Sequence, residues 1–201
     1  MEEPGSPIAE QRPQRLLGVR FDEALMLACA LHADQVRKAS GVPYVAHLLG
    51  VTSLVLEEGG TEDMAIAALL HDAAEDQGGE ATLAGIERAF GGDVARWVRQ
   101  ASDTFEMPKP EWETRKREYL AAIPMADWEA RLIMLADKVH NARSILADHE
   151  RVGPAVWEKF SVPRARTLWY YQTLLEVFER ELSPFLYDEL GECVSRMEGL
   201  D

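Results

Sequence analysis

The sequence predicts an all-α protein that folds as a compact multi-helix bundle. Apolar residues recur at helical spacing along almost the whole chain, and no region shows several alternating runs bounded by hairpin turns. Glycine and proline interrupt the helical stretches at short intervals, as in "SGVP" at 40–43 and "DQGG" at 76–79. No internal repeat is present, so helices of this length and number indicate a bundle rather than a solenoid.

The breaks between apolar stretches define the predicted helices in order. "SGVP" separates the first helix from the second, and "EEGGT" at 57–61 ends the second and caps the third. Thr61 is a suitable N-cap there, because Glu62 and Asp63 follow in the first turn. With boundary errors of about two to four residues, helices are expected at 21–38, 44–57, 61–74, 82–90, 92–103, 111–122, 127–147, 155–182 and 185–197.

The length of 201 residues is enough for one domain with a sizeable core and too short for two full domains. A composition of 47% hydrophobic and 28% charged residues is ordinary for a globular protein and argues against wholesale disorder. The N-terminus has acidic and proline residues where a secretory signal needs a basic start and an apolar stretch. We therefore expect a flexible tail at 1–17 and a single domain at 18–201.

The net charge of −14 disfavours an extended footprint for a nucleic-acid polymer or an anionic membrane, because long-range repulsion would oppose either. Apolar runs such as "ALMLACAL" are too short to cross a bilayer of about 30 Å. Cys29 and Cys193 are far apart in the sequence and match no metal-binding spacing, so we interpret them as free thiols in a reducing cytosol. We therefore expect a cytoplasmic protein with no nucleic-acid or membrane partner, and we leave its oligomeric state open. A small anionic ligand is still compatible with the net charge if local cations or a metal bind it.

An acidic cluster with one histidine ends the apolar run of "AALLHDAAEDQGG" at 67–79. His71 and Glu75 are four residues apart, as are Asp72 and Asp76, so each pair shares a strip of one helix surface. Crowded carboxylates repel one another, and a cation is the simplest remedy. The alternative is a solvated acidic face, but acids at a C-terminal turn oppose the helix dipole, which favours a site.

Two distant segments supply matching groups. Asp137 follows five nonpolar residues in "RLIMLADKV" and would be costly to bury without a partner or a metal. His47 lies on the first turn of its predicted helix, and taken alone it reads more readily as a core histidine than as a ligand.

Together, the three segments resemble the HD superfamily of metal-dependent phosphohydrolases. "RKASGVPYVAH" at 37–47, "LLHDAAEDQ" at 69–77 and "LADKVHNARS" at 135–144 are similar to the hydrolase domain of the Rel/SpoT alarmone enzymes and to stand-alone small alarmone hydrolases. The resemblance spans about residues 20–182, and three motifs in order are far more specific than a lone His-Asp doublet.

The resemblance implies an HD-domain bundle that holds one divalent cation, usually Mn²⁺, through His47, His71, Asp72 and Asp137. No histidine lies between Asp72 and Asp137, where binuclear HD enzymes carry additional ligands, which independently favours a single metal. Two imidazoles and two carboxylates also suit manganese better than a closed thiolate zinc site.

The same resemblance implies that Glu75 and Asp76 form the catalytic acidic pair, of which one member takes the water proton or orients the attack. It further implies that Arg37 and Lys38 contact the base of the substrate and that Asn141 and Ser144 contact the nucleoside. Family members often carry threonine at the Ser144 position, which weakens that assignment.

Other polar and aromatic residues stay open at this point. Arg115, Lys116 and Arg117 could face a pyrophosphate, but a charged helix surface is an equal alternative. Tyr170 and Tyr171 are expected to pack in the bundle. His32 is expected in the core or beside the ligands, and no role is indicated for His140 or His149.

The function implied by the resemblance is Mn²⁺-dependent hydrolysis of the 3′-pyrophosphate of guanosine 3′,5′-bis(diphosphate) (ppGpp) to GDP and pyrophosphate. The purine substrate is left open between ppGpp, ppApp, NADPH and another nucleoside phosphate, because stacking on Arg37 discriminates poorly between purines. A non-catalytic nucleotide sensor is the alternative from another class. Since the hydrolase domain uses the whole chain, alarmone synthesis is not expected.

Overall fold

The computed structural model describes residues 16–106 and 108–200, and the prediction of an all-α fold is confirmed there. Within these ranges, the one extended pairing is an isolated bridge between Val36 and Pro43. Most of the tail predicted at 1–17 lies outside the described residues.

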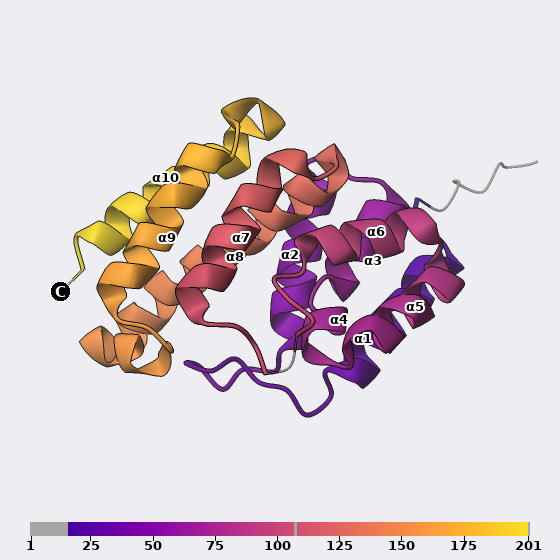
Figure 1. Cartoon of the computed structure of the whole chain (residues 1–201), viewed down its shortest axis with the longest axis horizontal. Helices are drawn as coiled ribbons and strands as arrows, with labels where there is room; N and C mark the ends of the chain where they lie inside the picture. The colour runs from indigo at the N-terminus through magenta and orange to yellow at the C-terminus, as the bar shows by residue number, and fades with distance from the viewer. Residues whose placement is uncertain (1–15, 107, 201) are drawn as a thin grey trace, which may run out of the picture.

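The helices follow one another closely along the described chain, as Figure 1 shows. They are α1 (Val19–Leu31), α2 (Val45–Glu57), α3 (Glu62–Leu70), α4 (Ala73–Asp76), α5 (Gly79–Phe90), α6 (Gly92–Ala101), α7 (Trp112–Ala122), α8 (Trp128–Val152), α9 (Arg164–Val177) and α10 (Pro184–Glu198), with short 3₁₀ helices η1 (Ile123–Met125), η2 (Gly153–Lys159) and η3 (Arg180–Leu182).

Helix α3 lies at the centre of the N-terminal half. Every residue from Met64 to Leu70 is buried, because α1, α2, α6 and α8 all pack against this helix. A helix covered on all sides needs no polar face, which explains why "MAIAALL" is an unbroken apolar run. The polar residues that follow Leu70 are therefore delivered to the interior of the molecule.

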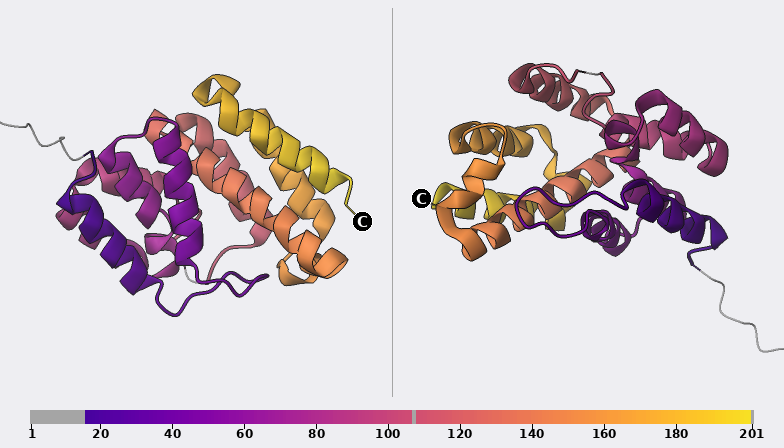
Figure 2. Two further views of the ribbon diagram at one scale, coloured as in Figure 1. Left: turned by 180° about the vertical axis from the view of Figure 1, so that it is seen from behind. Right: turned by 90° about the horizontal axis from the view of Figure 1, so that it is seen from below.

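Helix α8 is the shared wall of the structure. It packs against α2, α3 and α6 on one side and against α10 and η2 on the other. Figures 1 and 2 show the same arrangement from opposite sides, with α1 to α6 on one flank of α8 and α9 and α10 on the other. Apolar residues of both flanks join one continuous hydrophobic cluster. A polar residue on α8 can therefore face groups from both halves of the chain.

The helix predicted at 21–38 is too long. It ends at Leu31, and the chain then forms a loop up to Tyr44 that makes its own backbone hydrogen bonds, from Arg37 N to Val42 O at 2.8 Å and from Tyr44 N to Gln35 O at 2.9 Å. Gly41 has φ +70°, a left-handed conformation that suits glycine and lets the chain reverse.

The helix predicted at 61–74 is interrupted by a turn at His71 and Asp72, so that α3 ends at Leu70 and α4 begins at Ala73. Because of this turn, the side chains of the consecutive residues His71 and Asp72 both reach the same site, with His71 Nε2 3.0 Å from Asp72 Oδ2.

The helix predicted at 155–182 is also wrong. η2 ends at Lys159, and α9 begins only at Arg164, immediately after Pro163. Proline lacks an N–H and disfavours helical backbone at the residue before it, so the helix restarts instead of continuing. The preceding helix, in contrast, runs beyond its expected end at 147 to Val152, where Gly153 with φ +63° ends it.

No helix in the described ranges is both long enough and apolar enough to span a bilayer.

The predicted N-cap at Thr61 is confirmed, since its hydroxyl oxygen accepts a hydrogen bond from Met64 N at 3.3 Å. We expect Thr61→Ala to lower the free energy of unfolding by about 1 kcal/mol, because an N–H of α3 loses its partner. Urea denaturation measures this. Thr173→Ala is the control, because the Thr173 hydroxyl bonds to Trp169 O within α9 and caps no helix. Equal losses in both variants would contradict the capping role.

Candidate functional site

Two histidines and two aspartates converge where α2, α3 and α8 meet. His47, His71 and Asp137 are buried, and one potential ligand atom from each lies within 4.8 Å of the others. Asp72 adds a carboxylate oxygen, Oδ2, which lies 3.0 Å from His71 Nε2 and 3.5 Å from His47 Nε2. The structure thus brings together all four residues that the sequence suggested as metal ligands.

The free ring nitrogens make this cluster suited to a metal ion. Nε2 of His47 and Nε2 of His71 are buried and have no hydrogen bond of ordinary geometry, although Asp137 Oδ1 lies 3.1 Å from the first and 3.7 Å from the second. Buried polar atoms are almost always paired, so two orphans that face the same carboxylates call for a shared partner. A divalent cation with nitrogen and oxygen ligands fits this set.

A backbone contact orients the His71 ring. His71 Nδ1 lies 2.8 Å from Ala68 O, and because a carbonyl can only accept, Nδ1 carries the proton. Nε2 therefore faces the centre and can bind a metal once it gives up its own proton, as in metal-binding histidines whose other nitrogen is held by a carbonyl.

A second histidine orients the His47 ring. His47 Nδ1 lies 2.9 Å from His140 Nδ1. Burial, together with the charges of His47 and Arg37, lowers the pKa of His140 to about 4, so this ring is neutral at pH 7 and its Nδ1 can accept a hydrogen bond from Nδ1–H of His47. That arrangement leaves His47 Nε2 free for a metal. His140, for which the sequence indicated no role, thus contacts the site.

Gly50 makes room for this histidine pair. A Cβ atom at Gly50 would lie 2.2 Å from Cδ2 and 2.3 Å from Nε2 of His140. Gly50 is one turn of α2 beyond His47, so any side chain there would push the His140 ring away from its contact with His47.

The charges in the cluster stabilise one another. Burial acts to lower the pKa of His71, but the carboxylates of Asp72 and Asp137 outweigh it and raise the pKa well above its usual range. Burial acts to raise the pKa of Asp72, but His71 and His47 hold it well below its usual range. The cluster therefore keeps its carboxylates ionised, and a bound cation would replace the Nε2 proton of His71.

Neighbouring side chains complete the hydrogen bonds of the two carboxylates. The Tyr44 hydroxyl donates to Asp72 Oδ2 at 2.7 Å. Asp137 accepts from Asn141 Nδ2 at 2.5 Å and from Lys138 Nζ at 2.6 Å. Ligand carboxylates that are held in this way keep their orientation.

The two acids on α4 are held differently. Glu75 has both oxygens engaged, because Lys109 Nζ donates to Oε1 at 2.8 Å and Asp103 N donates to Oε2 at 2.9 Å. Asp76 Oδ2 accepts from Gln35 Nε2 at 2.8 Å. Burial and the charge of Asp72 raise the pKa of Asp76, which favours this carboxylate as a proton acceptor.

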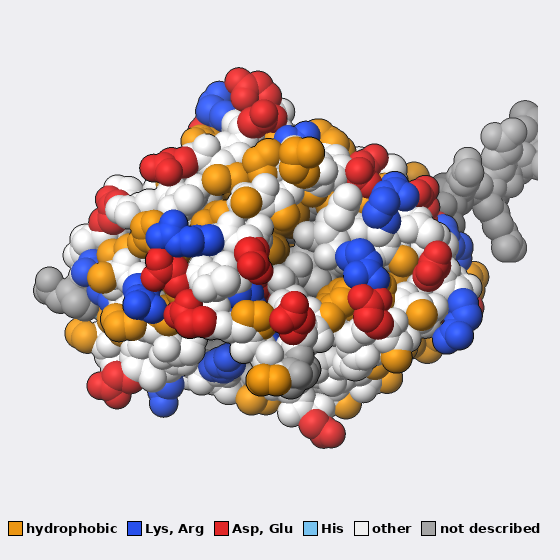
Figure 3. All heavy atoms as spheres, viewed as in Figure 1, with side chains coloured by type: hydrophobic (Ala, Val, Ile, Leu, Met, Phe, Trp, Pro, Cys, Tyr) orange, Lys and Arg blue, Asp and Glu red, His pale blue; other side chains and the backbone are white. Residues whose placement is uncertain are grey.

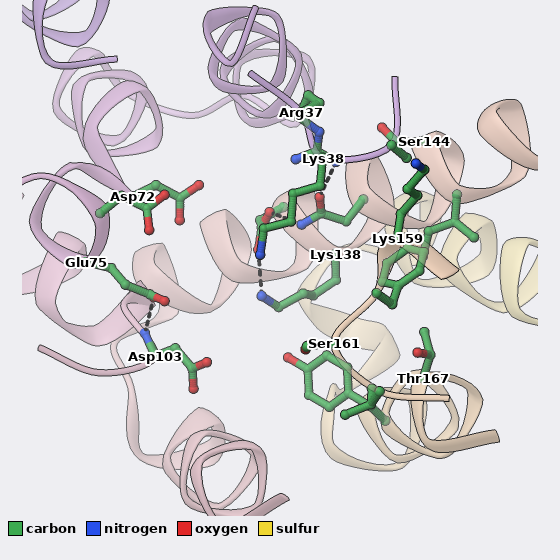
Figure 4. A pocket seen from close by; sticks show the side chains of 18 of the residues that line it. Arg37, Lys38, Asp72, Glu75, Asp103, Lys138, Ser144, Lys159, Ser161 and Thr167 are labelled. Atoms are coloured by element: carbon green, nitrogen blue, oxygen red, sulfur yellow. Dashed lines mark hydrogen bonds and ion pairs between the residues drawn. The ribbon is translucent and has the colours of Figure 1, made fainter. Parts of the chain in front are cut away.

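A cavity of about 480 Å³ opens beside the cluster. Figure 4 shows Asp72, Glu75 and Asp103 on one side of it and Ser144, Lys159 and Thr167 on the other. Elsewhere, acidic and basic side chains are interspersed over the face drawn in Figure 3. Within the described chain, seven cationic side chains line the cavity, although the protein carries a net charge of −14: Arg37, Lys38, Lys109, Arg115, Lys116, Lys138 and Lys159. Six carboxylates of the described chain also line it: Asp72, Glu75, Asp76, Asp103, Asp137 and Asp148. A metal at the His-Asp cluster would offset part of this negative charge and leave the cations available to a small polyanion.

The residues suggested for substrate binding all line this cavity. Arg37 Nη2 donates to Asn141 Oδ1 at 2.7 Å, and Lys38 follows it in the same loop. The Ser144 hydroxyl donates to His140 O at 2.9 Å on its own helix, so it can still accept a hydrogen bond from a ligand.

The basic run on α7 divides between the cavity and the surface. Arg115 and Lys116 point inward and both pair with Asp103, at 2.7 Å for Lys116 Nζ. Burial, together with the charges of Lys138 and Arg115, lowers the pKa of Lys116 to about 7. Arg117 pairs with Glu113, and its side chain is 62% exposed, so the charged-surface alternative holds for this residue. Tyr170 and Tyr171 both pack in the core and line the cavity.

Sequence reasoning missed several residues that hold the acidic pair, among them Gln35, Asp103 and Lys109. All three lie in loops, where no periodicity indicates which way a side chain points. Lys109 follows Glu75 by 34 residues, and nothing in the segment "DTFEMPK" indicates that the two side chains are in contact. His32 is buried and stacks on Tyr44, with ring centroids 5.2 Å apart.

Comparison with known sequences gives consistent results. The sequence model of the HD-domain family, described as "HD domain", matches residues 24–162. Guanosine-3′,5′-bis(diphosphate) 3′-pyrophosphohydrolase MESH1 of Mus musculus is 37% identical over 143 residues, which cover 70% of this chain and 75% of that protein. The bifunctional (p)ppGpp synthase/hydrolase SpoT of Escherichia coli K12 is 33% identical over 190 residues, covering 90% of this chain and 26% of SpoT.

Comparison with solved structures agrees. A structure described as a metazoan ortholog of SpoT that hydrolyses ppGpp superposes with a TM-score of 0.73 at 29% sequence identity, covering 92% of this chain and 98% of that one.

We expect Gly50→Ala to weaken metal binding by about 10–100-fold, because displacing His140 removes the hydrogen bond that orients His47. Isothermal titration with Mn²⁺ measures the affinity, and circular dichroism checks the fold. Gly85→Ala is the matched control, because a Cβ there meets only the end of the Arg88 side chain, at 4.0 Å. Unchanged affinity in Gly50→Ala would show that the His140 contact does not matter for the site.

Proposed function

The chain belongs to the HD-domain family, and from this premise we propose that it is a metal-dependent hydrolase that converts ppGpp to GDP and pyrophosphate. The observation that carries the proposal is the convergence of His47, His71, Asp72 and Asp137 beside an acidic pair in a cation-lined cavity. Relatives that carry this activity in their names are 37% identical over more than two thirds of the chain.

We propose His47, His71, Asp72 and Asp137 as the ligands of one divalent cation, with Mn²⁺ as the metal that suits two imidazoles and two carboxylates. When bound, such a cation lowers the pKa of a water molecule and polarises a phosphoryl oxygen. The backbone contact of His71 and the His140 contact of His47 hold both rings ready before the cation arrives.

Asp76 and Glu75 have different roles toward the attacking water. Asp76 accepts the proton of the attacking water, since its pKa is raised and its Oδ2 is positioned by Gln35. Glu75, with both oxygens engaged by Lys109 and Asp103 N, acts as a fixed acceptor that orients the water. The water oxygen bonds to the phosphorus attached at the 3′ position, the bond from that phosphorus to O3′ breaks, and O3′ gains a proton.

The cationic lining accounts for binding of the polyanion. Arg115 and Lys138 lie near the acids and offset the charge of the departing pyrophosphate, whereas Lys116, with its pKa lowered to about 7, is only partly charged there. Arg37 lies over the Tyr44 ring, with Cζ 5.8 Å from its centroid, and its guanidinium plane can stack on a purine. Asn141 bonds to both Arg37 and Asp137, and so ties the base region to the metal region.

The deciding experiment is product analysis by anion-exchange chromatography. Metal-free protein is incubated with ppGpp, ppApp or NADPH, each with and without Mn²⁺, and Asp137→Asn serves as the metal-deficient control. Pyrophosphate released from ppGpp only with Mn²⁺ and only by the wild type is the expected result. Turnover of NADPH or ppApp alone would replace the substrate, and tight ppGpp binding without cleavage would indicate a sensor.

We expect Asp76→Asn to lower kcat by about 10²–10⁴-fold while metal content stays unchanged, because the amide cannot accept the water proton. Steady-state kinetics and metal analysis by mass spectrometry check both points. Asp188→Asn, which removes an exposed acid paired with Arg180, is the control and should keep full activity. Normal kcat in Asp76→Asn would assign the proton transfer to another group.

A further inference from the structure

One strip of α8 runs along the whole cavity. It presents Asp137, Asn141, Ser144 and Asp148, all of which line the cavity. Their spacing of four, three and four residues keeps them on one face of the helix. At 1.5 Å per residue, Asp148 lies about 16 Å beyond Asp137 along the axis. The strip therefore begins at the metal ligands and ends in a carboxylate at the opposite end of the cavity.

Asp148 is largely withdrawn from water, and its partner Arg151 engages only one of its two oxygens. The residue is 9% exposed, and in the described part of the chain its one hydrogen bond comes from Arg151 Nη1 to Oδ1 at 3.1 Å. The Arg151 side chain is 65% exposed, and an ion pair of that kind contributes little. A carboxylate in this position costs free energy unless a further donor meets its second oxygen.

Lys159 brings a complementary group to the same end. It lies at the end of η2, lines the cavity and has an exposed side chain. Figure 4 places it with Ser144, on the side away from Glu75 and Asp72. The far end of the cavity thus offers two carboxylate oxygens as acceptors and one ammonium group as a donor.

We propose that Asp148 and Lys159 read the edge of a guanine base. This inference rests on the proposed function, in which the pyrophosphate end of the nucleotide lies at the metal and the base stacks near Arg37. Guanine carries two adjacent donors, N1–H and the 2-amino group, which match the two oxygens of Asp148, and an acceptor, O6, which matches Lys159. Adenine has an unprotonated N1 and no 2-amino group, so it would leave the carboxylate unpaired and face it with a lone pair.

The test compares kcat/KM for ppGpp and for its adenosine, inosine and xanthosine counterparts, with Mn²⁺ present. The wild type should prefer ppGpp over the adenosine compound by about 100-fold or more and should lose roughly 10-fold with inosine, which lacks the 2-amino group. Asp148→Asn should lower kcat/KM for ppGpp by about 10–100-fold and raise it for the xanthosine compound. An asparagine offers one acceptor to N1–H and one donor to the 2-oxo group of xanthine, and a purely structural role of Asp148 would not produce that exchange.

Asp93→Asn is the matched control. Asp93 also pairs with an arginine three residues later, Arg96, at 2.6 Å, but its side chain is 68% exposed and does not line the cavity. Asp93→Asn should leave kcat/KM unchanged for all four substrates. Lys159→Met is a second variant that removes an exposed side chain and so carries little risk to folding; it should lower kcat/KM for ppGpp and its inosine counterpart alike.

The outcomes separate the two proposals. Wild-type cleavage of ppGpp with no change of base preference in Asp148→Asn and Lys159→Met would overturn the base-reading role and leave the hydrolase function standing. No cleavage of any of the four compounds by the wild type would overturn both.

Discussion

The structure depends on the convergence of two imidazoles and two carboxylates in its interior. Buried ionisable groups are costly unless they are paired, and here His47 and His71 lie against the carboxylates of Asp72 and Asp137, in an arrangement that a divalent cation at their centre would fit. These residues come from α2, from the end of α3 and from α8, so the three helices must meet in one register. The apolar surfaces of α3 and α8 supply the packing that holds them there.

The side chains of His47, His71 and Asp137 are held in orientation by neighbouring groups that lie outside the cluster itself. Ala68 O sets the proton position of His71, His140 does the same for His47, and Asn141 holds Asp137. Asn141 also accepts from Arg37, so one amide couples the metal region to the region proposed for the base. A substitution at Gly50 or Asn141 would therefore change the orientation of His47 or Asp137, although neither Gly50 nor Asn141 is itself one of the four converging residues.

The cavity gathers cationic side chains although the protein as a whole is acidic. Lysine and arginine side chains from the 32–44 loop, the 102–111 loop, α7, α8 and η2 line one hollow in an acidic chain. Long-range repulsion discourages large polyanions, whereas close cations in a partly desolvated cavity favour a small one. Burial of these cations beside Asp72, Glu75 and Asp103 also keeps their charges mutually compensated in the absence of a substrate.

The sequence by itself determined the helical class and the N-cap at Thr61, because these depend on periodicity and on residues within one turn. Through motifs similar to a known family, it also pointed to the four residues that converge at the site, His47, His71, Asp72 and Asp137. Only the tertiary structure decided that His140 contacts His47, that Lys116 faces inward while Arg117 faces outward, and that Asp148 ends the cavity strip. The physical reason is that spacing fixes which residues share a helix face, whereas the direction of that face depends on packing against helices and loops far away in the chain.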